Sequence, residues 1–280
     1  MARITLVIFG AIIVLIILVL IASAIANTLF KKSVAQELTA FTGSLKSKAQ
    51  TVQLSDLESL PLPVQNWLNY SGIVGKERIT TVYSKQNITM RLKANQAWMA
   101  GQAEQYVRTE EPGFIWIVDI KMAPLLHIAG RDKYVDGQGN MLIKILSLIT
   151  VANARGKEID QGSLVRYLAE IVWYPSAALS SYIQWEGIDS HSAKATMSYQ
   201  GVSASGVFTF NDQGQAVSFV AERYRESEGE YRLETWLCKI NEYKAFDELK
   251  IPAQADLVWK LETGDFHWYH LEVEDMEFGY

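Results

Sequence analysis

The feature that most constrains the fold of this chain is a two-residue alternation of apolar and polar side chains, which recurs from residue 79 onward. Stretches such as ITTVYSKQNITMRLKA and GFIWIVDIKMA alternate in this way and are rich in β-branched and aromatic residues. That pattern is typical of half-buried strands. Short turn sequences separate the strands, for example Asp136-Gly137 and NDQG at 211–214. Neighbouring strands are therefore predicted to pair antiparallel.

One helical segment interrupts the strands. In SLVRYLAEIVWYPSAAL, residues 163–179, the apolar residues Leu164, Leu168 and Ile171 fall on one helix face, and Pro175 ends the helix. About five strands precede this segment and about six follow it, and a sheet of that size curls or closes. The predicted fold class is α+β, mostly antiparallel β: a strongly curved sheet or open barrel with a helical plug near 161–174.

The first thirty residues indicate a membrane segment. ITLVIFGAIIVLIILVLIASAIANTLF, residues 4–30, carries no charge and is long enough to cross a bilayer as a tilted helix. The alternative is a cleaved signal peptide, because Ala-Ser-Ala at 22–24 has the small-x-small pattern of a cleavage site. We expect a transmembrane anchor at 1–32, a stalk or short helices at 33–59, and a curved β domain at 60–280.

Charge and cysteine content limit location and partners. Lys31, Lys32, Lys46 and Lys48 follow the apolar run, and by the positive-inside rule they favour a cytoplasmic C-terminal domain. A short tail before a signal-like run favours export instead, and we expect a single-pass protein with an extracytoplasmic C-terminal domain. The net charge of -5 and the scattered basic residues argue against a nucleic-acid partner. The single cysteine, Cys238, excludes an internal disulfide.

Several sequence blocks together carry a family resemblance. They are LPLPVQNWLNYSG, EEPGFIWIVDIKM, DKYVDGQGNMLIKIL, GSLVRYLAEIVWYPSAAL and IPAQADLVWKLETG, which cover most of residues 60–265. Together they resemble an uncharacterised family of bacterial membrane-associated proteins, a domain of unknown function, which implies no particular chemistry. The Pro-Gly-Phe-x-Trp strand and the Asp-Gly turn two strands later also resemble the half-barrel lipoprotein carriers of Gram-negative envelopes. Such a likeness implies a fold rather than a function.

The helical segment also carries the most distinctive charged pair. Arg166 and Glu170 are four residues apart and face the same way on a helix, with Trp173 one turn further along. The pair has three interpretations: a surface ion pair of small energetic value, a buried structural network completed by Arg223 or Arg225, or a ligand-binding or catalytic site.

We expect a membrane-anchored protein that binds a lipid or another apolar molecule in an aromatic-lined β cavity, without catalysis and without a cofactor. The predicted ligand-binding residues are Trp116, Arg166, Tyr167, Glu170, Trp173 and Arg223. Two alternatives stay open: a hydrolase-like enzyme that uses Glu170 and Arg166, and a scaffold that binds a protein partner along a sheet edge. The ligand, any protein partner and the oligomeric state are not predicted.

Two arrangements resemble metal sites only in part. Asp132 and Asp136 are spaced as in a calcium loop, but Tyr134 stands where an oxygen ligand is required. His267 and His270 are three residues apart, which on a strand is expected to turn their side chains to opposite faces. No metal site is therefore predicted.

Overall fold

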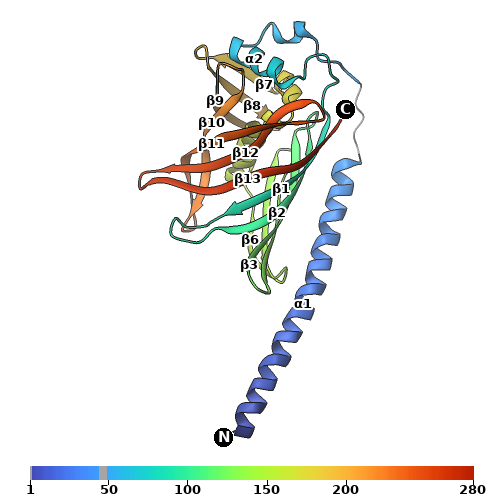
Figure 1. Ribbon diagram of the computed structural model, residues 1–280, viewed down its shortest axis with the longest axis vertical. Helices are drawn as coiled ribbons and strands as arrows, with labels where there is room; N and C mark the ends of the chain where they lie inside the picture. Colours follow the sequence, from blue (N-terminus) through green and yellow to red (C-terminus); the bar gives the residue numbers. More distant parts are fainter. Residues whose placement is uncertain (1, 44–48) are drawn as a thin grey trace.

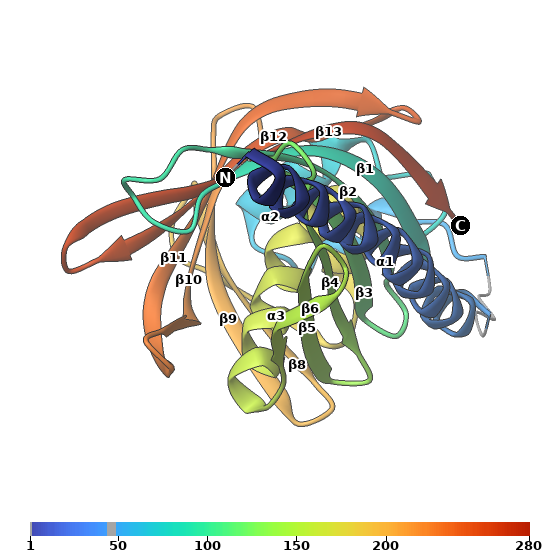
Figure 2. The ribbon, with the colours of Figure 1, turned by 90° about the horizontal axis from the view of Figure 1, so that it is seen from below.

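The computed structural model describes residues 2–43 and 49–280, and in it thirteen antiparallel strands form one sheet. The strand order is β6-β5-β4-β3-β2-β1-β13-β12-β11-β10-β9-β8-β7. The sheet curls into a half-barrel around helix α3 (Lys157–Glu170), as Figures 1 and 2 show. The predicted fold class is thus confirmed. Lys46 and Lys48, which bear on the membrane orientation, lie outside the described residues.

Six strands precede α3 and seven follow it. The strands are β1 (Thr81–Met90), β2 (Met99–Arg108), β3 (Gly113–Ala123), β4 (Leu126–Val135), β5 (Gln138–Ile145), β6 (Ile149–Ala154), β7 (Ile183–Gly187), β8 (Ser192–Tyr199), β9 (Val202–Phe210), β10 (Ala216–Ser227), β11 (Glu230–Phe246), β12 (Leu249–Leu261) and β13 (Gly264–Gly279). The additional strand before α3 is β6, a short edge strand with mostly exposed side chains. Because few of its side chains are buried, the sequence of β6 lacks the clear alternation of apolar and polar residues that identifies the other strands.

The remaining elements are helical. They are α1 (Ala2–Thr42), η1 (Leu54–Leu57), α2 (Leu62–Ser71), α3, η2 (Ile171–Trp173) and η3 (Pro175–Leu179). In α2, Pro63 lies in the first turn and Gly72 ends the helix with a left-handed φ of 78°, as those residue types favour. The helix α1 continues to Thr42, so residues 33–42 belong to the same helix as the apolar run, where we expected a separate stalk or short helices.

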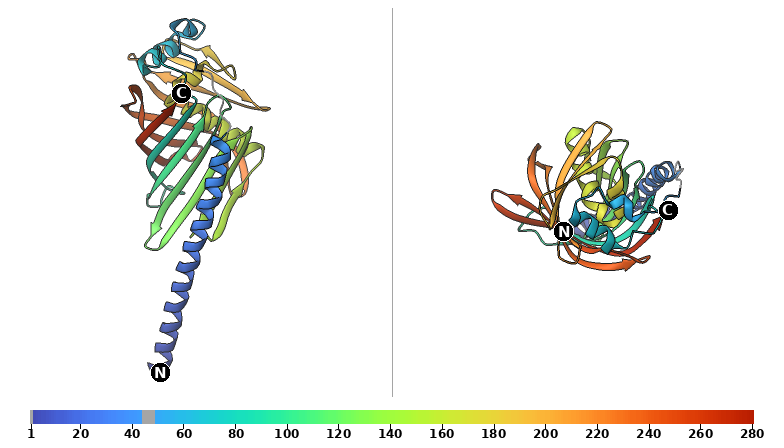
Figure 3. Two further views of the ribbon diagram at one scale, coloured as in Figure 1. Left: turned by 90° about the vertical axis from the view of Figure 1, so that its right-hand side faces the viewer. Right: turned by 90° about the horizontal axis from the view of Figure 1, so that it is seen from above.

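The two faces of the sheet have different neighbours, and strand β4 illustrates this. Arg131 and Lys133 meet Glu37 of α1 at 3.2 and 3.0 Å, whereas Asp132 between them meets Arg166 of α3. Because side chains alternate along a strand, α1 lies on the convex face and α3 on the concave face. Figure 3 shows α1 running along the outside of the strands.

The concave face holds the hydrophobic core. Helix α3 packs mainly on β5, β9 and β10, and Gly139 permits this approach because a Cβ there would lie 2.7 Å from the Ile159 carbonyl oxygen. At the end of the half-barrel away from the N-terminus, α2 covers the core (Figure 1), and its Trp67 stacks on Phe208 at 6.4 Å.

Helix α1 has two parts with different surroundings. Its most apolar window has a mean hydropathy of 3.5 and none of it is buried, which makes this segment a candidate membrane span or signal sequence. Further along, Phe30 and Val34 are buried against Ala129, Ile117 and Leu142 on the convex face. The first part is therefore free of the sheet and the second is fixed to it.

Candidate functional site

Arg166 on α3 is the centre of a polar network on the concave face. Its Nε donates to Glu170 Oε1 at 2.7 Å, and one terminal nitrogen donates to Asp132 Oδ2 at 3.0 Å. The other terminal nitrogen donates to Gln105 Oε1 at 3.0 Å. The side chains of Arg166, Glu170 and Asp132 are 15%, 13% and 15% exposed. The charged pair is thus part of a largely buried network rather than a surface ion pair.

The network continues along β1, β2 and β3. Gln105 Nε2 donates to the second oxygen of Glu170 at 2.6 Å, and Gln86 Nε2 donates to Gln105 Oε1 at 3.3 Å. The indole of Trp116 donates to Gln86 Oε1 at 3.3 Å. The Arg166 guanidinium also lies over the Trp116 ring, 5.1 Å from its centroid. The predicted residues Trp116, Arg166 and Glu170 are therefore brought together.

Burial governs the charges in this network. It raises the pKa of Asp132 above its ordinary value, although Arg166 and Arg223 act in the opposite direction. Burial would lower the pKa of Arg166, but Glu170 and Asp132 outweigh it and the pKa is raised. Arg166 consequently remains a cation between two carboxyl groups.

Arg223 on β10 has different surroundings. Its Nε donates to the Gly162 carbonyl oxygen at 3.0 Å, and its guanidinium lies 4.8 Å from the centroid of Trp236 and 6.0 Å from that of Trp259. Within the described part of the chain, no carboxylate lies within 4.0 Å of it. Burial, followed by the repulsion of Arg166, lowers its pKa to about 10. Arg223 is thus a half-buried cation without a direct counterion.

The same arrangement is repeated two residues along β10. Arg225 lies 6.0 Å from the ring centroid of Trp259 and 5.9 Å from that of Phe266. Residues two apart on a strand face the same way, and Trp236 and Trp259 are directly opposite each other in the register of β11 and β12. The concave face therefore presents two guanidinium groups beside a row of aromatic rings.

The other two predicted residues are packed inside. The Tyr167 hydroxyl donates to the Arg108 carbonyl oxygen at 3.1 Å, and the Trp173 indole donates to the Pro252 carbonyl oxygen at 3.0 Å. Tyr167 is fully buried and Trp173 is 5% exposed. Both fix the helical segment against the strands, and a ligand-binding role for either stays a prediction.

Sequence reasoning missed the partners that the strands contribute. The sequence suggested Asp132 only as part of a calcium loop, and it gave no indication of Gln105 or Gln86. The sequence did contain one signal, the alternation of side chains along a strand. Asp132 is two residues from Tyr134, which is fully buried, so both side chains lie on the same face of β4. This alternation alone could not show that the face of β4 that carries Asp132 lies beneath Arg166.

The prediction that His267 and His270 face opposite sides was wrong. His270 Nδ1 lies 2.7 Å and His267 Nε2 3.0 Å from the same Asp256 oxygen. The register between β12 and β13 shifts at Leu257 and Val258, so Trp268 is an extra residue that restores His267 to the side of Asp256. Hydrogen bonds from His270 and Asn241 outweigh the effect of burial and lower the pKa of Asp256.

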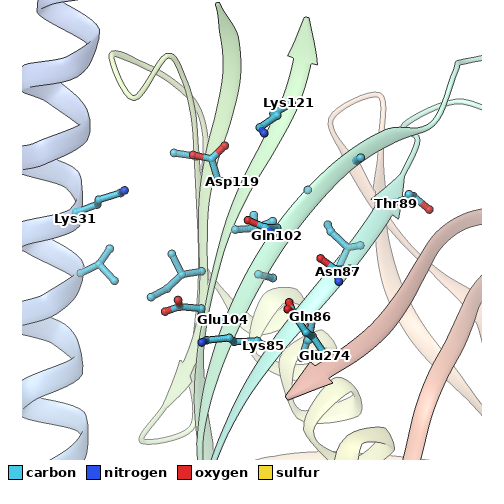
Figure 4. A pocket seen from close by; sticks show the side chains of 18 of the residues that line it. Lys31, Lys85, Gln86, Asn87, Thr89, Gln102, Glu104, Asp119, Lys121 and Glu274 are labelled. Atoms are coloured by element: carbon cyan, nitrogen blue, oxygen red, sulfur yellow. The ribbon is translucent and has the colours of Figure 1, made fainter. Parts of the chain in front are cut away.

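Two pockets lie along α1 outside the curve of the sheet. The larger, about 1150 Å³, is bounded by α1 and by β1, β2 and β3. Figure 4 shows Lys31, Lys85, Glu104, Asp119 and Lys121 around it. Phe30, Val34 and Ile117 also line it, so the pocket has both charged and apolar walls.

Comparison with models of protein families assigns this sequence to one family. Residues 50–271 match the model of a family described as a family of unknown function, DUF6544. The chain belongs to this DUF6544 family. The resemblance inferred from the sequence blocks is thus confirmed, and no curated protein matches the chain significantly.

Comparison with solved structures matches the chain to bacterial proteins, among them the following three. A LolA superfamily protein from Nitrosomonas europaea is 12% identical, with a TM-score of 0.43 over 78% of this DUF6544 chain and 94% of that one. An outer membrane lipoprotein-sorting protein domain from Vibrio parahaemolyticus is 9% identical, with a TM-score of 0.41 over 71% and 85%. A beta-barrel-like protein of unknown function from Brucella abortus is 7% identical, with a TM-score of 0.22 over 72% and 99%. Likenesses at this level of identity do not extend to function.

Proposed function

We propose that this protein is held at a membrane by α1 and binds a lipid or another apolar molecule on the concave face of its sheet, without catalysing a reaction. The observation that carries the proposal is Arg223, a half-buried cation between Trp236 and Trp259 with no carboxylate in ion-pair range in the described chain. An amphiphile with an anionic group would supply a direct ion-pair partner, in addition to the more distant carboxylates of Asp132 and Glu170. The buried indole N–H of Trp236, which has no hydrogen-bond partner within the described residues, is a further donor beside it.

Apolar surface for the body of such a ligand lies on the same face. Met90, Met99, Trp116 and Ile128 are half-buried and pack at the edge of the core. Side chains alternate between the two faces along each strand, and these four pack against the core on the concave face. They therefore line the concave side of the sheet. Aromatic and apolar side chains with a few polar groups are the usual lining of sites for lipids and similar ligands.

The hydrolase alternative is less well supported by the geometry. Both oxygens of Glu170 already accept hydrogen bonds, one from Arg166 and one from Gln105. A general acid or base needs an oxygen within reach of the substrate. The scaffold alternative has only the two edge strands of the sheet, β6 and β7, in its favour.

Lipid analysis of the full-length protein tests the proposal. The chain is purified in detergent, and bound lipids are extracted and identified by mass spectrometry. We expect an anionic lipid or fatty acid at near-stoichiometric amounts, and saturable binding of the fluorescent fatty acid cis-parinaric acid. Arg223→Gln should weaken that binding about tenfold, because it removes a charge-assisted contact worth about 1.4 kcal/mol.

The matched control is Lys194→Gln, which removes the same charge from an exposed position on β8 and should leave binding unchanged. The absence of co-purified lipid together with no saturable binding of the fatty acid would refute ligand binding. Equal effects of the two variants would show that net charge, rather than Arg223, governs the affinity.

A further inference from the structure

We propose that the two hairpin turns beside α1 form a membrane-contacting rim that rests in the interfacial layer of a lipid bilayer. The rim is defined as residues 122–126, around the β3–β4 turn, and residues 146–151, around the β5–β6 turn. The inference rests on the anchoring part of the proposed function, because it requires that α1 crosses the bilayer. It adds a second membrane contact, made by the sheet itself.

The rim exposes apolar side chains at its tips. Leu125 is 69% exposed and Ile149 is 61% exposed, and Met122, Leu148 and Val151 are also exposed large hydrophobic residues. Contiguous exposed apolar groups on a surface commonly mark a contact with another apolar phase. Both turns lie at the end of the half-barrel nearest the N-terminus of α1 (Figure 1).

Three other hairpin turns of the sheet have different chemistry. The β4–β5, β8–β9 and β10–β11 turns use Asp136-Gly137, Gln200-Gly201 and Glu228-Gly229. The rim turns instead place Leu125 and Leu146 at left-handed φ values of 66° and 53°. Leucine in that conformation costs about 1 kcal/mol or more, and an exposed leucine gains nothing from water. Contact with lipid would offset both costs.

The position of the rim along α1 fits the thickness of a bilayer. Ser23 is the first buried residue of α1, and its hydroxyl donates to the Leu146 carbonyl oxygen at 2.8 Å. At 1.5 Å per residue, the segment from Ile4 to Ser23 rises roughly 30 Å, which is about the thickness of the hydrocarbon core. A bilayer crossed by this segment would therefore have its surface at the level of the rim.

Polar groups and a pocket occur at the same level. Asn27 of α1 accepts a hydrogen bond from Ser147 at 3.3 Å, and such groups suit the headgroup layer rather than the hydrocarbon core. A pocket of about 630 Å³ lies between Leu20 and Ala24 of α1 and the β3–β4 turn. It is large enough to admit part of a lipid chain.

Depth-dependent fluorescence quenching in vesicles tests the rim. The full chain with Cys238→Ala is the background, since Cys238 is the only cysteine. Single cysteines are introduced by Leu125→Cys, Leu148→Cys, Ile12→Cys and Gln213→Cys and are labelled with the environment-sensitive dye NBD. Each protein is reconstituted into phosphatidylcholine–phosphatidylglycerol vesicles that contain lipids with a nitroxide near the headgroup or near the chain end.

We expect the shallow nitroxide to quench the labels at 125 and 148 at least twofold more than the label at 213, which lies in the β9–β10 turn beside α2. The deep nitroxide should quench the label at 12. One contrary result is that nitroxide lipids quench only the label at 12, while aqueous iodide quenches the labels at 125 and 148 as strongly as the label at 213. In that case α1 crosses the bilayer, but the membrane-contacting rim is refuted. If the label at 12 is also unquenched by lipid, α1 does not cross the bilayer and both proposals on the membrane fail.

Discussion

At the scale of single residues, the position of Arg166 between Asp132 and Glu170 has a measurable effect on stability. Replacing it by methionine keeps much of the side-chain volume but leaves two largely buried carboxyl groups without their cation. We expect Arg166→Met to lower the free energy of unfolding by about 3–5 kcal/mol. Denaturant unfolding followed by tryptophan fluorescence measures this difference.

The matched control for that substitution is Lys260→Met. Lys260 pairs with Asp265 at the sheet surface, where the two side chains are 41% and 57% exposed. Such pairs contribute about 0.5 kcal/mol or less, so this variant should unfold close to the wild-type midpoint. Similar losses in the two variants would contradict a buried role for Arg166.

The raised pKa of Asp132 predicts how that loss depends on pH. Because burial raises this pKa in the folded protein, the folded state takes up a proton more readily than the unfolded chain, whose aspartates titrate near about 3.9. Stability related to Asp132 therefore increases as pH falls through the raised value towards the unfolded one. In Arg166→Met the opposing charge is gone, so the loss of stability should be smaller at pH 5 than at pH 8.

Unfolding curves of both proteins at the two pH values check this sign. A loss that is equal at pH 5 and pH 8 would mean that Asp132 is ionised without cost in the folded variant. Asp132→Asn in the Arg166→Met background should reduce the pH dependence, because it removes one of the two carboxyl groups that lost their cation.

Residue roles could be predicted from the sequence only where partners lie on the same element. Arg166 and Glu170 share a helix face, so their contact follows from spacing. Asp132 and Gln105 come from different strands, and only the curl of the sheet brings them to α3. The two histidines near Asp256 show a further limit, since one extra residue at Trp268 reverses the face of every side chain on one side of it.

At the scale of elements, the contact between β5 and α3 depends on the absence of a side chain at Gly139. A Cβ there would lie 2.7 Å from both the Ile159 carbonyl oxygen and the Ser163 hydroxyl. Gly139→Ala should therefore push α3 away from β5 and lower the free energy of unfolding by about 1–3 kcal/mol. Thermal unfolding followed by circular dichroism measures the change.

Gly162 on α3 provides the opposite expectation. A Cβ at this position would meet its nearest neighbour, Arg223 Nε, at an ordinary 3.6 Å. Alanine is the better helix former by about 1 kcal/mol, so Gly162→Ala should leave stability unchanged or raise it. If Gly139→Ala were as stable as Gly162→Ala, α3 would not be closely packed on β5.

Element types were predictable because local patterns determine them. Alternation identified most strands, and Pro63 and Gly72 marked the ends of α2. Element lengths were less predictable: α1 continues past the apolar run to Thr42 because Phe30, Val34 and Phe41 are buried against the domain. That burial is a tertiary contact, and a stretch of polar residues with scattered apolar ones does not indicate it.

At the scale of the whole molecule, the attachment of α1 to the convex face joins the candidate membrane span to the sheet. Val34 is buried there, whereas Gln36, two residues on, is exposed. Val34→Asp should release the second part of α1, because it buries an unpaired charge in the contact. Hydrogen exchange measured by mass spectrometry should then accelerate in peptides covering residues 28–42, with the peptides of β8–β12 unchanged.

Gln36→Asp is the control and should keep the exchange rates of the wild-type protein. If residues 28–42 exchange equally in both variants, the contact of Val34 with the sheet does not hold α1. The number of alternating segments predicted a curved sheet around a helical plug, but the contact of α1 with the convex face was not predictable from periodicity, because it joins segments far apart in the chain.

The unbroken course of α1 has a mechanical consequence. No proline interrupts it between Ala2 and Thr42, and Glu37 ties its later turns to Arg131 and Lys133. Helix α1 and the sheet should therefore tilt together as one rigid body. In the proposed arrangement, in which α1 crosses the bilayer, a change in bilayer thickness would alter the angle at which the half-barrel stands over the lipid, because transmembrane helices tilt more in thin bilayers than in thick ones. Access from the lipid phase to Arg223 would then depend on the type of membrane in which the protein resides.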